Sequence, residues 1–391
     1  MTAQKSQVAL LALCQATAMT TNTVLVTVAA LIGFALAADK ALATLPLAVR
    51  QIATMTGTVP ASLLMQRMGR RGGFLLGTVL GGVGAGVGIW GVAIANFWIF
   101  TLAMALLGLS NSFVGYYRFA AADVAAEAFR SQAISWVIAG GVIAAVLGPW
   151  LATSSQAWFE SELYIGALVA VLGLQILSSL LLLGLNVPKV AAAPGDRPSR
   201  PLIQIVRQPK FLVATLGSTV SYGVMVFVMT ATPLAMTAVA HSFEQTASVI
   251  QWHVLGMFAP ALATGWLIKR LGVLTIILTG AVMNLGCMAL NLAGTSFVHF
   301  AVALLLLGLG WNFMYVGSTN LLTETHTPAE TGSVQALHDL IVFGFVALAT
   351  FLSGPIFHRF DWHMLNQVSW PLVLITLLLV LWQRVRSHAH A

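Results

Sequence analysis

The chain has 391 residues, of which 59% are hydrophobic and only 7% are charged, and its mean hydropathy is +0.91. A soluble domain has roughly a quarter of its residues charged, so this composition excludes a soluble globular protein and predicts a polytopic membrane protein. The net charge of +7 would suit a protein that binds nucleic acid. The positions of the charges give a simpler explanation, so the sequence predicts no nucleic-acid partner.

Long apolar stretches follow one another along the whole chain. A spanning helix needs about 20 apolar residues, because the hydrocarbon core is about 30 Å thick and a helix rises about 1.5 Å per residue. About twelve such stretches are present, with approximate limits 7–37, 41–66, 72–95, 97–121, 131–154, 161–186, 210–235, 243–268, 273–294, 297–322, 333–356 and 366–385. The first is predicted to be a retained helix, because it is about twice too long for a secretory signal.

The loop after the second stretch carries a motif, "SLLMQRMGRRGG", at residues 62–73. It resembles the signature of the major facilitator superfamily, G-x-L-x-D-R-x-G-R-[RK]. The matching residues are Leu64, Arg67, Gly69, Arg70 and Arg71. Ser62 replaces the first glycine and Gln66 replaces the acidic residue, so the match is partial. The resemblance implies an all-α integral membrane protein with 12 transmembrane helices in two six-helix bundles, whose motif arginines hold a gate.

Charges inside or close to the first spans are candidate functional groups, because a charge in lipid is costly and usually faces protein or water. Arg50 lies some nine residues into the second stretch. Farther along, Arg118 stands near Asp123 and Glu127, and this group is interpreted as part of a cytoplasmic gate rather than as a substrate contact.

The chain divides into two similar halves. "LLGLSNSF" at 106–113 recurs as "LLGLGWNF" at 306–313, a shift of 200 residues. "GWLIKRLG" at 265–272 repeats the loop motif, with Lys269, Arg270 and Gly272 as the matching gate residues. Internal duplication of six helices is typical of secondary transporters.

A segment rich in proline and charge separates the halves and has no long apolar run. We therefore predict an N-terminal six-helix bundle over 1–186, a cytoplasmic linker over 187–209 and a C-terminal six-helix bundle over 210–391. The sequence contains no plausible nucleophile–base–acid set, so it predicts no enzyme.

Two motifs with soft donor atoms follow the linker. Met225 and Met229 lie one helical turn apart in "VMVFVM", and His253 and Met257 lie one turn apart in "WHVLGM". Their stretches are antiparallel and joined by a short outer loop, which predicts that Met225 and His253 share one depth. Thioether sulfur and neutral imidazole suit Cu(I) rather than Mg²⁺ or Ca²⁺, so the pattern indicates a ladder of copper ligands. Methionines that only fill space in the helix packing are the alternative.

The two motifs together resemble the CcoA-like (CalT) copper importers of the major facilitator superfamily. The resemblance implies import of copper across a bacterial inner membrane by alternating access, for example for assembly of cbb3-type cytochrome oxidase. Copper is then the transported substrate and there is no cofactor. Some members of that family are described as riboflavin transporters, so a small organic solute such as riboflavin or a drug-like molecule is the alternative. In that alternative, Trp252, Phe227, Trp311 and Phe313 are expected to line the cavity.

His338 and Asp339 lie about six residues into the eleventh stretch. The pair is either a proton carrier or gate latch, or a structural ion pair near the helix end.

Lysine and arginine collect on one side of the membrane. If both termini are cytoplasmic, the outer loops keep only Lys40 and Arg359. This asymmetry follows the positive-inside rule. It predicts a multi-pass protein of the bacterial inner (cytoplasmic) membrane with both termini cytoplasmic, in contact with the lipid bilayer and monomeric.

Overall fold

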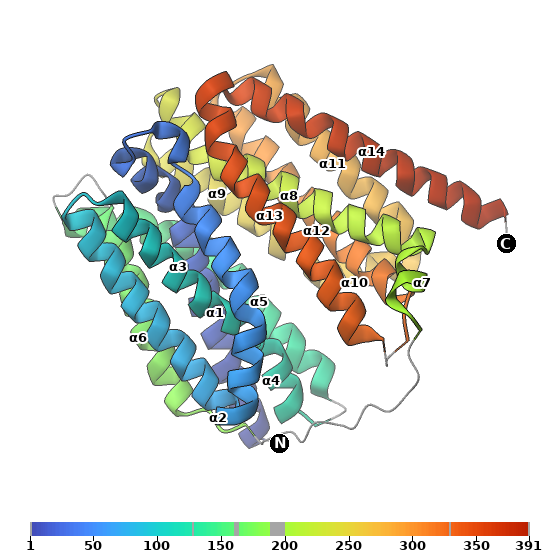
Figure 1. Ribbon diagram of the computed structural model, residues 1–391, viewed down its shortest axis with the longest axis horizontal. Coiled ribbons are helices and arrows are strands. Elements are labelled where there is room, and N and C mark those ends of the chain that lie inside the picture. Colours follow the sequence, from blue (N-terminus) through green and yellow to red (C-terminus); the bar gives the residue numbers. More distant parts are fainter. Residues whose placement is uncertain (1, 127–128, 160–163, 188–199, 328–329, 390–391) are drawn as a thin grey trace. The chain divides into compact units, whose positions relative to one another are not determined.

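The computed structural model describes residues 2–126, 129–159, 164–187, 200–327 and 330–389, and every regular element in them is a helix (Figure 1). The elements are α1 (Thr2–Leu36), η1 (Lys40–Leu42), α2 (Leu45–Ala93), α3 (Phe97–Val114), α4 (Tyr117–Val124), α5 (Arg130–Ser154), η3 (Ser155–Trp158), α6 (Ile165–Leu183), α7 (Leu202–Val206), α8 (Pro209–Ala238), α9 (Phe243–Phe258), α10 (Ala261–Leu271), α11 (Val273–Ala293), α12 (Phe297–Thr323), α13 (Thr331–Phe360) and α14 (Trp362–Ala389).

The number of spans depends on how α2 is counted. Within the described residues, ten helices are long and apolar enough to cross a membrane, and the bent pair α9 and α10 adds an eleventh. One of the ten holds 54 residues, Lys40–Ala93, and as a straight helix it would reach about 80 Å, more than twice the hydrocarbon core. Because its backbone leaves the helical conformation at Gly69, this segment counts as two spans. The predicted all-helical fold is confirmed, and the ten or eleven candidate spans reach the predicted twelve only when Lys40–Ala93 is divided at Gly69.

Two glycines in the repeated loop motifs adopt the same backbone conformation. Gly69 has φ 81° and ψ 163°, and Gly272 has φ 86° and ψ 146°. A residue with a Cβ atom is strained in this region, whereas glycine enters it freely. Each glycine therefore allows the chain to leave one helix and start the next without a longer loop.

The chain forms two compact units, which we call the first and second units. The first unit comprises Met1–Ala191 and Ala240–Val254, and the second comprises Ala192–Val239 and Leu255–Ala391. The early part of α9 therefore groups with the first unit rather than with the predicted C-terminal bundle. Within that unit the Phe243 ring lies 5.0 Å from the Tyr164 ring.

Helix packing repeats from one unit to the other. In the first unit α1 packs on α5 and α6, and α2 packs on α3 and α6. In the second unit α8 packs on α13 and α14, and α11 packs on α12 and α14. The second pattern is the first one with each helix replaced by its counterpart in the other half. The packing thus agrees with the duplication inferred from the repeated segments, which lie on α3 and α12.

Only part of the predicted linker can be described, because 188–199 lie outside the described residues. Its later part forms the short helix α7 and is attached to the start of α13. The Arg200 guanidinium contacts both carboxylate oxygens of Glu330 at 2.8 Å, and Glu330 also accepts from the backbone N–H of Thr327 at 2.8 Å. The Arg200 ion pair, together with these backbone donors, holds the pKa of Glu330 well below its usual range. The linker end is therefore fixed by charge-assisted hydrogen bonds.

One predicted span is interrupted. The stretch expected over 243–268 is two helices, because α9 ends at Phe258 and α10 begins at Ala261. Pro260 explains the break, since proline has no N–H to donate and its ring clashes with the preceding turn of a helix.

Candidate functional site

Five aromatic side chains of the second unit gather around Tyr222. The ring centres of Trp311, Tyr315 and Phe343 lie 5.5, 5.3 and 5.8 Å from that of Tyr222, each at a steep interplanar angle. Trp311 and Tyr315 stack at 5.2 Å with an angle of 11°, and Phe258 lies 6.3 Å from Trp311. We call these five residues the aromatic cluster.

Local geometry explains why the cluster forms. Trp311 and Tyr315 are four residues apart on α12 and so lie on one face of the helix. The Ser221 hydroxyl donates to the Trp311 carbonyl at 3.3 Å, which joins α8 to α12 beside Tyr222. Trp311 is 8% exposed, whereas the other four rings are half-buried. The cluster can therefore offer ring faces and edges to a planar aromatic ligand.

The helix that carries Phe258 breaks directly after it, and polar side chains stabilise the break. The Asn312 amide donates to the Met257 carbonyl at 2.7 Å, and the Thr264 hydroxyl donates to the side-chain oxygen of Asn312 at 2.6 Å. A buried backbone carbonyl costs free energy unless it accepts a hydrogen bond. Asn312 meets this need at the end of α9 and so holds Phe258 at the aromatic cluster.

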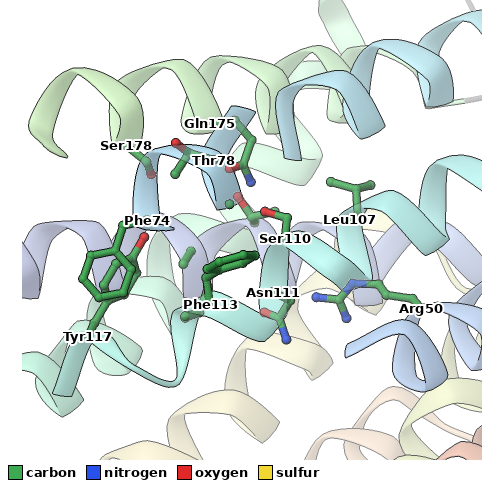
Figure 2. Close-up of a pocket in the computed structure, with 14 residues that line it drawn as sticks. Arg50, Phe74, Thr78, Leu107, Ser110, Asn111, Phe113, Tyr117, Gln175 and Ser178 are labelled. Atoms are coloured by element: carbon green, nitrogen blue, oxygen red, sulfur yellow. The ribbon is translucent and has the colours of Figure 1, made fainter. Parts of the chain in front are cut away.

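A pocket with polar walls lies inside the first unit (Figure 2). It holds about 380 Å³ of empty space, its open mouth included, and is lined by residues from α1, α2, α3, α4 and α6. Arg50 lines it and is only 3% exposed, so the predicted intramembrane charge lies within protein. Figure 2 shows the Arg50 guanidinium on the same side of the pocket as the Asn111 amide. We call this the polar pocket.

The four predicted copper ligands are all buried. Met225, Met229 and Met257 belong to the second unit and are 1%, 8% and 8% exposed, and His253 belongs to the first unit and is 0% exposed. Met225 and Met229 lie one turn apart on α8, as expected from their spacing. Among the described residues no group of three or more His, Cys, Asp or Glu side chains could hold a metal ion. Copper ligation by these residues stays a prediction.

The four aromatic side chains expected to line the cavity of an organic-solute transporter do not line one cavity in the structure. Trp311 lies in the aromatic cluster, but Trp252 is 49% exposed on α9. Phe227 lines an apolar pocket in the second unit together with Phe345 and Leu352, and this pocket holds about 420 Å³ of empty space, its open mouth included. Phe313 is half-buried on α12.

The motif arginines differ in their surroundings. Arg70 donates to a carboxylate oxygen of Asp123 at 3.0 Å, and its guanidinium lies 5.9 Å from the Tyr116 ring. Arg67 and Arg71 are exposed. Arg118, which the sequence groups with Asp123 and Glu127 in a cytoplasmic gate, lies over the Phe119 ring at 4.9 Å, and Glu127 lies outside the described residues.

In the second motif, Lys269 and Arg270 stand in the exposed last turn of α10, just before Gly272. On α13 the buried His338 contacts Asp339 through Nδ1 and a carboxylate oxygen at 3.0 Å, while the Asp339 side chain is 54% exposed. Gate or proton roles for these residues stay predictions.

We expect Arg70→Ala to slow transport about two- to fivefold while leaving the affinity of the purified protein for its substrate intact. A half-exposed ion pair is worth up to about 1 kcal/mol, and Arg70 does not line the polar pocket. Initial uptake rates and equilibrium binding of the same variant test this. Asp123→Asn should reproduce the effect and Arg71→Ala should have a smaller one. A collapse of affinity with normal turnover would disprove the gate assignment.

Several residues of the aromatic cluster and polar pocket were not predicted from the sequence. Tyr222, Phe258 and Phe343 carry no spacing signal, because they come from different helices. Trp311 and Tyr315 do share helical spacing, and Asn111 lies inside an apolar span. A search for polar residues within spans, in addition to charges, would have found Asn111.

Comparison with known proteins identifies similar chains. The family description Major Facilitator Superfamily matches residues 11–349. The riboflavin transporter RfnT of Brucella anthropi is 38% identical over 380 residues, which cover 96% of this chain and 95% of that protein. YdeG of Bacillus subtilis, an uncharacterized MFS-type transporter, is 29% identical over 92% of this chain and 88% of its own length.

Solved structures agree with the fold. A D-xylose-proton symporter superposes with a TM-score of 0.72 at 14% identity and covers 96% of each chain. The nucleoside transporter NupG superposes with a TM-score of 0.75 at 13% identity and covers 97% of this chain and 99% of its own. At these identities the likeness concerns the fold alone.

Proposed function

This chain belongs to the major facilitator superfamily, and from that membership we propose that it is a secondary transporter of riboflavin or a closely similar flavin. The observation that carries the proposal is 38% identity to a riboflavin transporter over 96% of the chain. This relation favours the organic-solute alternative over copper. A transporter of this superfamily is not an enzyme, in agreement with the absence of a catalytic motif from the sequence.

The aromatic cluster supports the same proposal on physical grounds. A flavin has a planar, fused aromatic ring, and such rings gain about 1–3 kcal/mol from stacking on protein aromatic side chains. Half-buried rings from α8, α9, α12 and α13 supply this surface in the second unit. The protein is expected to expose its binding groups to one side of the membrane at a time. We place it in an inner membrane with both termini cytoplasmic.

Copper import is the second candidate, and it rests on Met225, Met229, His253 and Met257. Buried methionines also serve as adaptable packing residues. None of the relatives described above is named for copper, and so the copper proposal depends on the donor chemistry of these four side chains alone.

Uptake of radiolabelled riboflavin and of copper by the same cells tests the proposal. We expect saturable riboflavin uptake above that of cells without the protein, and no added copper uptake. The double variant Met225→Leu, Met229→Leu keeps volume and hydrophobicity, so it should keep riboflavin uptake. The copper alternative would be established instead by two results together. The parent would take up copper but no riboflavin, and the double variant would lose the copper uptake.

A further inference from the structure

The apolar pocket of the second unit is formed by residues of α8, α13 and α14. Its residues on α8 are buried, whereas Leu348 and Leu352 on α13 and Val368 on α14 are 50%, 37% and 44% exposed. α8 therefore forms the floor of the pocket, and the exposed side chains form its mouth. We call this pocket the apolar groove.

The mouth of the apolar groove opens toward hydrocarbon. Both α13 and α14 are long and apolar enough to cross a membrane. Exposed leucine and valine side chains on such helices face lipid, whose tails are as apolar as they are. Acyl chains are therefore present at the mouth at the concentration of the bilayer itself.

The walls of the apolar groove offer no free polar group to an occupant. Of the residues that line it, Ser369 alone has a polar side chain, and this residue is 1% exposed. Its hydroxyl donates to the Leu365 carbonyl at 3.2 Å and so is already paired. A flavin carries ring carbonyls and an N–H, and burying these here without partners would cost free energy. The chemistry of the walls therefore selects a hydrocarbon chain.

The length and depth of the apolar groove match one leaflet of a bilayer. From Phe345 to Ile356 the axis of α13 rises about 17 Å, and half of the hydrocarbon core is about 15 Å. Ile356 lies one turn before α13 ends at Phe360, and Val368 lies less than two turns after α14 begins at Trp362. The groove thus runs from the membrane surface at which α13 ends to near the middle of the bilayer.

A cation stands at the surface end of the apolar groove. Arg359 lies one turn beyond Ile356 and two turns beyond Leu352, so it shares the face of α13 that lines the groove. It is exposed, and it makes no ion pair or hydrogen bond with any residue that the structure describes. The carboxylate of Asp361 instead accepts from the backbone N–H of Met364 at 2.9 Å. The Arg359 guanidinium is therefore available to an anion, and its fork of donors fits a phosphate.

We propose that the apolar groove is a phospholipid site, in which one acyl chain lies along α13 and the lipid phosphate contacts Arg359. The groove has an open mouth, so one side of the chain stays in contact with the bilayer. This site lies wholly within the second unit. It does not rest on the proposed function, because neither the groove nor Arg359 belongs to the aromatic cluster.

Native mass spectrometry of the purified full-length protein tests the site, with two lipids that carry the same acyl chains. Palmitoyl-oleoyl phosphatidylethanolamine has the phosphate, and palmitoyl-oleoylglycerol lacks it. We expect the wild type to bind one phospholipid at least about tenfold more tightly than the diacylglycerol. Arg359→Gln should weaken phospholipid binding about tenfold and leave diacylglycerol binding unchanged, and Arg359→Lys, which keeps the charge, should keep most of the affinity.

A second variant blocks the apolar groove itself. Val368→Trp places a large side chain at the mouth and should weaken binding of both lipids about tenfold. The matched control is Val282→Trp, the same exchange at a position of α11 that is 59% exposed and does not line the groove. It should change neither affinity. All of these positions are exposed, and thermal unfolding checks that each variant is folded.

Three results would each overturn the phospholipid site. The first is equal affinity of Val368→Trp and Val282→Trp for the phospholipid. The second is an Arg359→Gln variant that binds the phospholipid as tightly as the wild type does. The third is displacement of the lipid by riboflavin, mole for mole, which would make the groove part of the flavin site. If Val368→Trp fails to fold, the Arg359 variants and the comparison of the two lipids still decide.

Discussion

Replacement of Trp311 by leucine is expected to raise the KM for riboflavin about ten- to hundredfold. Trp311 touches three other rings of the aromatic cluster, at 5.5, 5.2 and 6.3 Å. Its loss removes the support beneath Tyr222 and Tyr315 as well as its own surface, and loss of one aromatic stacking partner costs about 1–3 kcal/mol. Initial uptake rates over a range of riboflavin concentrations measure the change.

Two further variants make this result specific. Trp311→Phe keeps a ring in the cluster and should recover most of the affinity. Trp252→Leu removes the same side chain from a position on α9 that is 49% exposed, and it should leave KM unchanged. If Trp252→Leu and Trp311→Leu raise KM equally, the aromatic cluster is not the binding surface.

A methyl group at Gly108 is expected to destabilise the first unit strongly. A Cβ atom there would lie 2.8 Å from the Cβ of Ala53 and would overlap the Arg50 carbonyl. Because the overlapped atom belongs to the backbone, α3 must move away from α2. We expect Gly108→Ala to lower the free energy of unfolding by about 1–3 kcal/mol and to reduce the amount of protein in the membrane.

Gly86→Ala is the matched control for this prediction. A Cβ atom at Gly86 meets nothing within 4 Å, and alanine is favoured over glycine in a helix by about 0.5–1 kcal/mol. This variant should be neutral or slightly stabilising in a thermal unfolding assay. The close approach of α3 to Arg50 would be disproved if Gly108→Ala unfolds at the temperature of the parent.

Apolar stretches and repeated segments were sufficient to predict most of the fold. Spans of about 20 apolar residues predict helices directly, because backbone groups in lipid must be paired within the segment. The repeated loop motif also has a physical cause, since Gly69 and Gly272 share a backbone conformation open to glycine. Pro260 is a sequence signal for the break between α9 and α10. The continuous apolar run around it nevertheless led to the prediction of one unbroken span.

The aromatic cluster and polar pocket were harder to predict, because they depend on which helix faces meet. Tyr222 and Phe343 are far apart in the sequence, and only the packing of α13 on α8 brings their rings within 5.8 Å. Thr21 and Gln175 read as ordinary polar residues within spans. They line one pocket because α1 packs on α6, which a sequence does not display. The methionine spacing, in contrast, is visible in the sequence but does not distinguish ligands from packing.

The bond between Asn312 and Met257 has a mechanical consequence. In an unbroken helix, the Met257 carbonyl would accept a hydrogen bond from the backbone N–H four residues farther along the chain. Here one side-chain amide holds it at 2.7 Å, and breaking a buried bond without a new partner costs about 1–3 kcal/mol. Loss of this bond is therefore expected to loosen the last turn of α9, which carries Phe258, without breaking the backbone hydrogen bonds of the neighbouring helices.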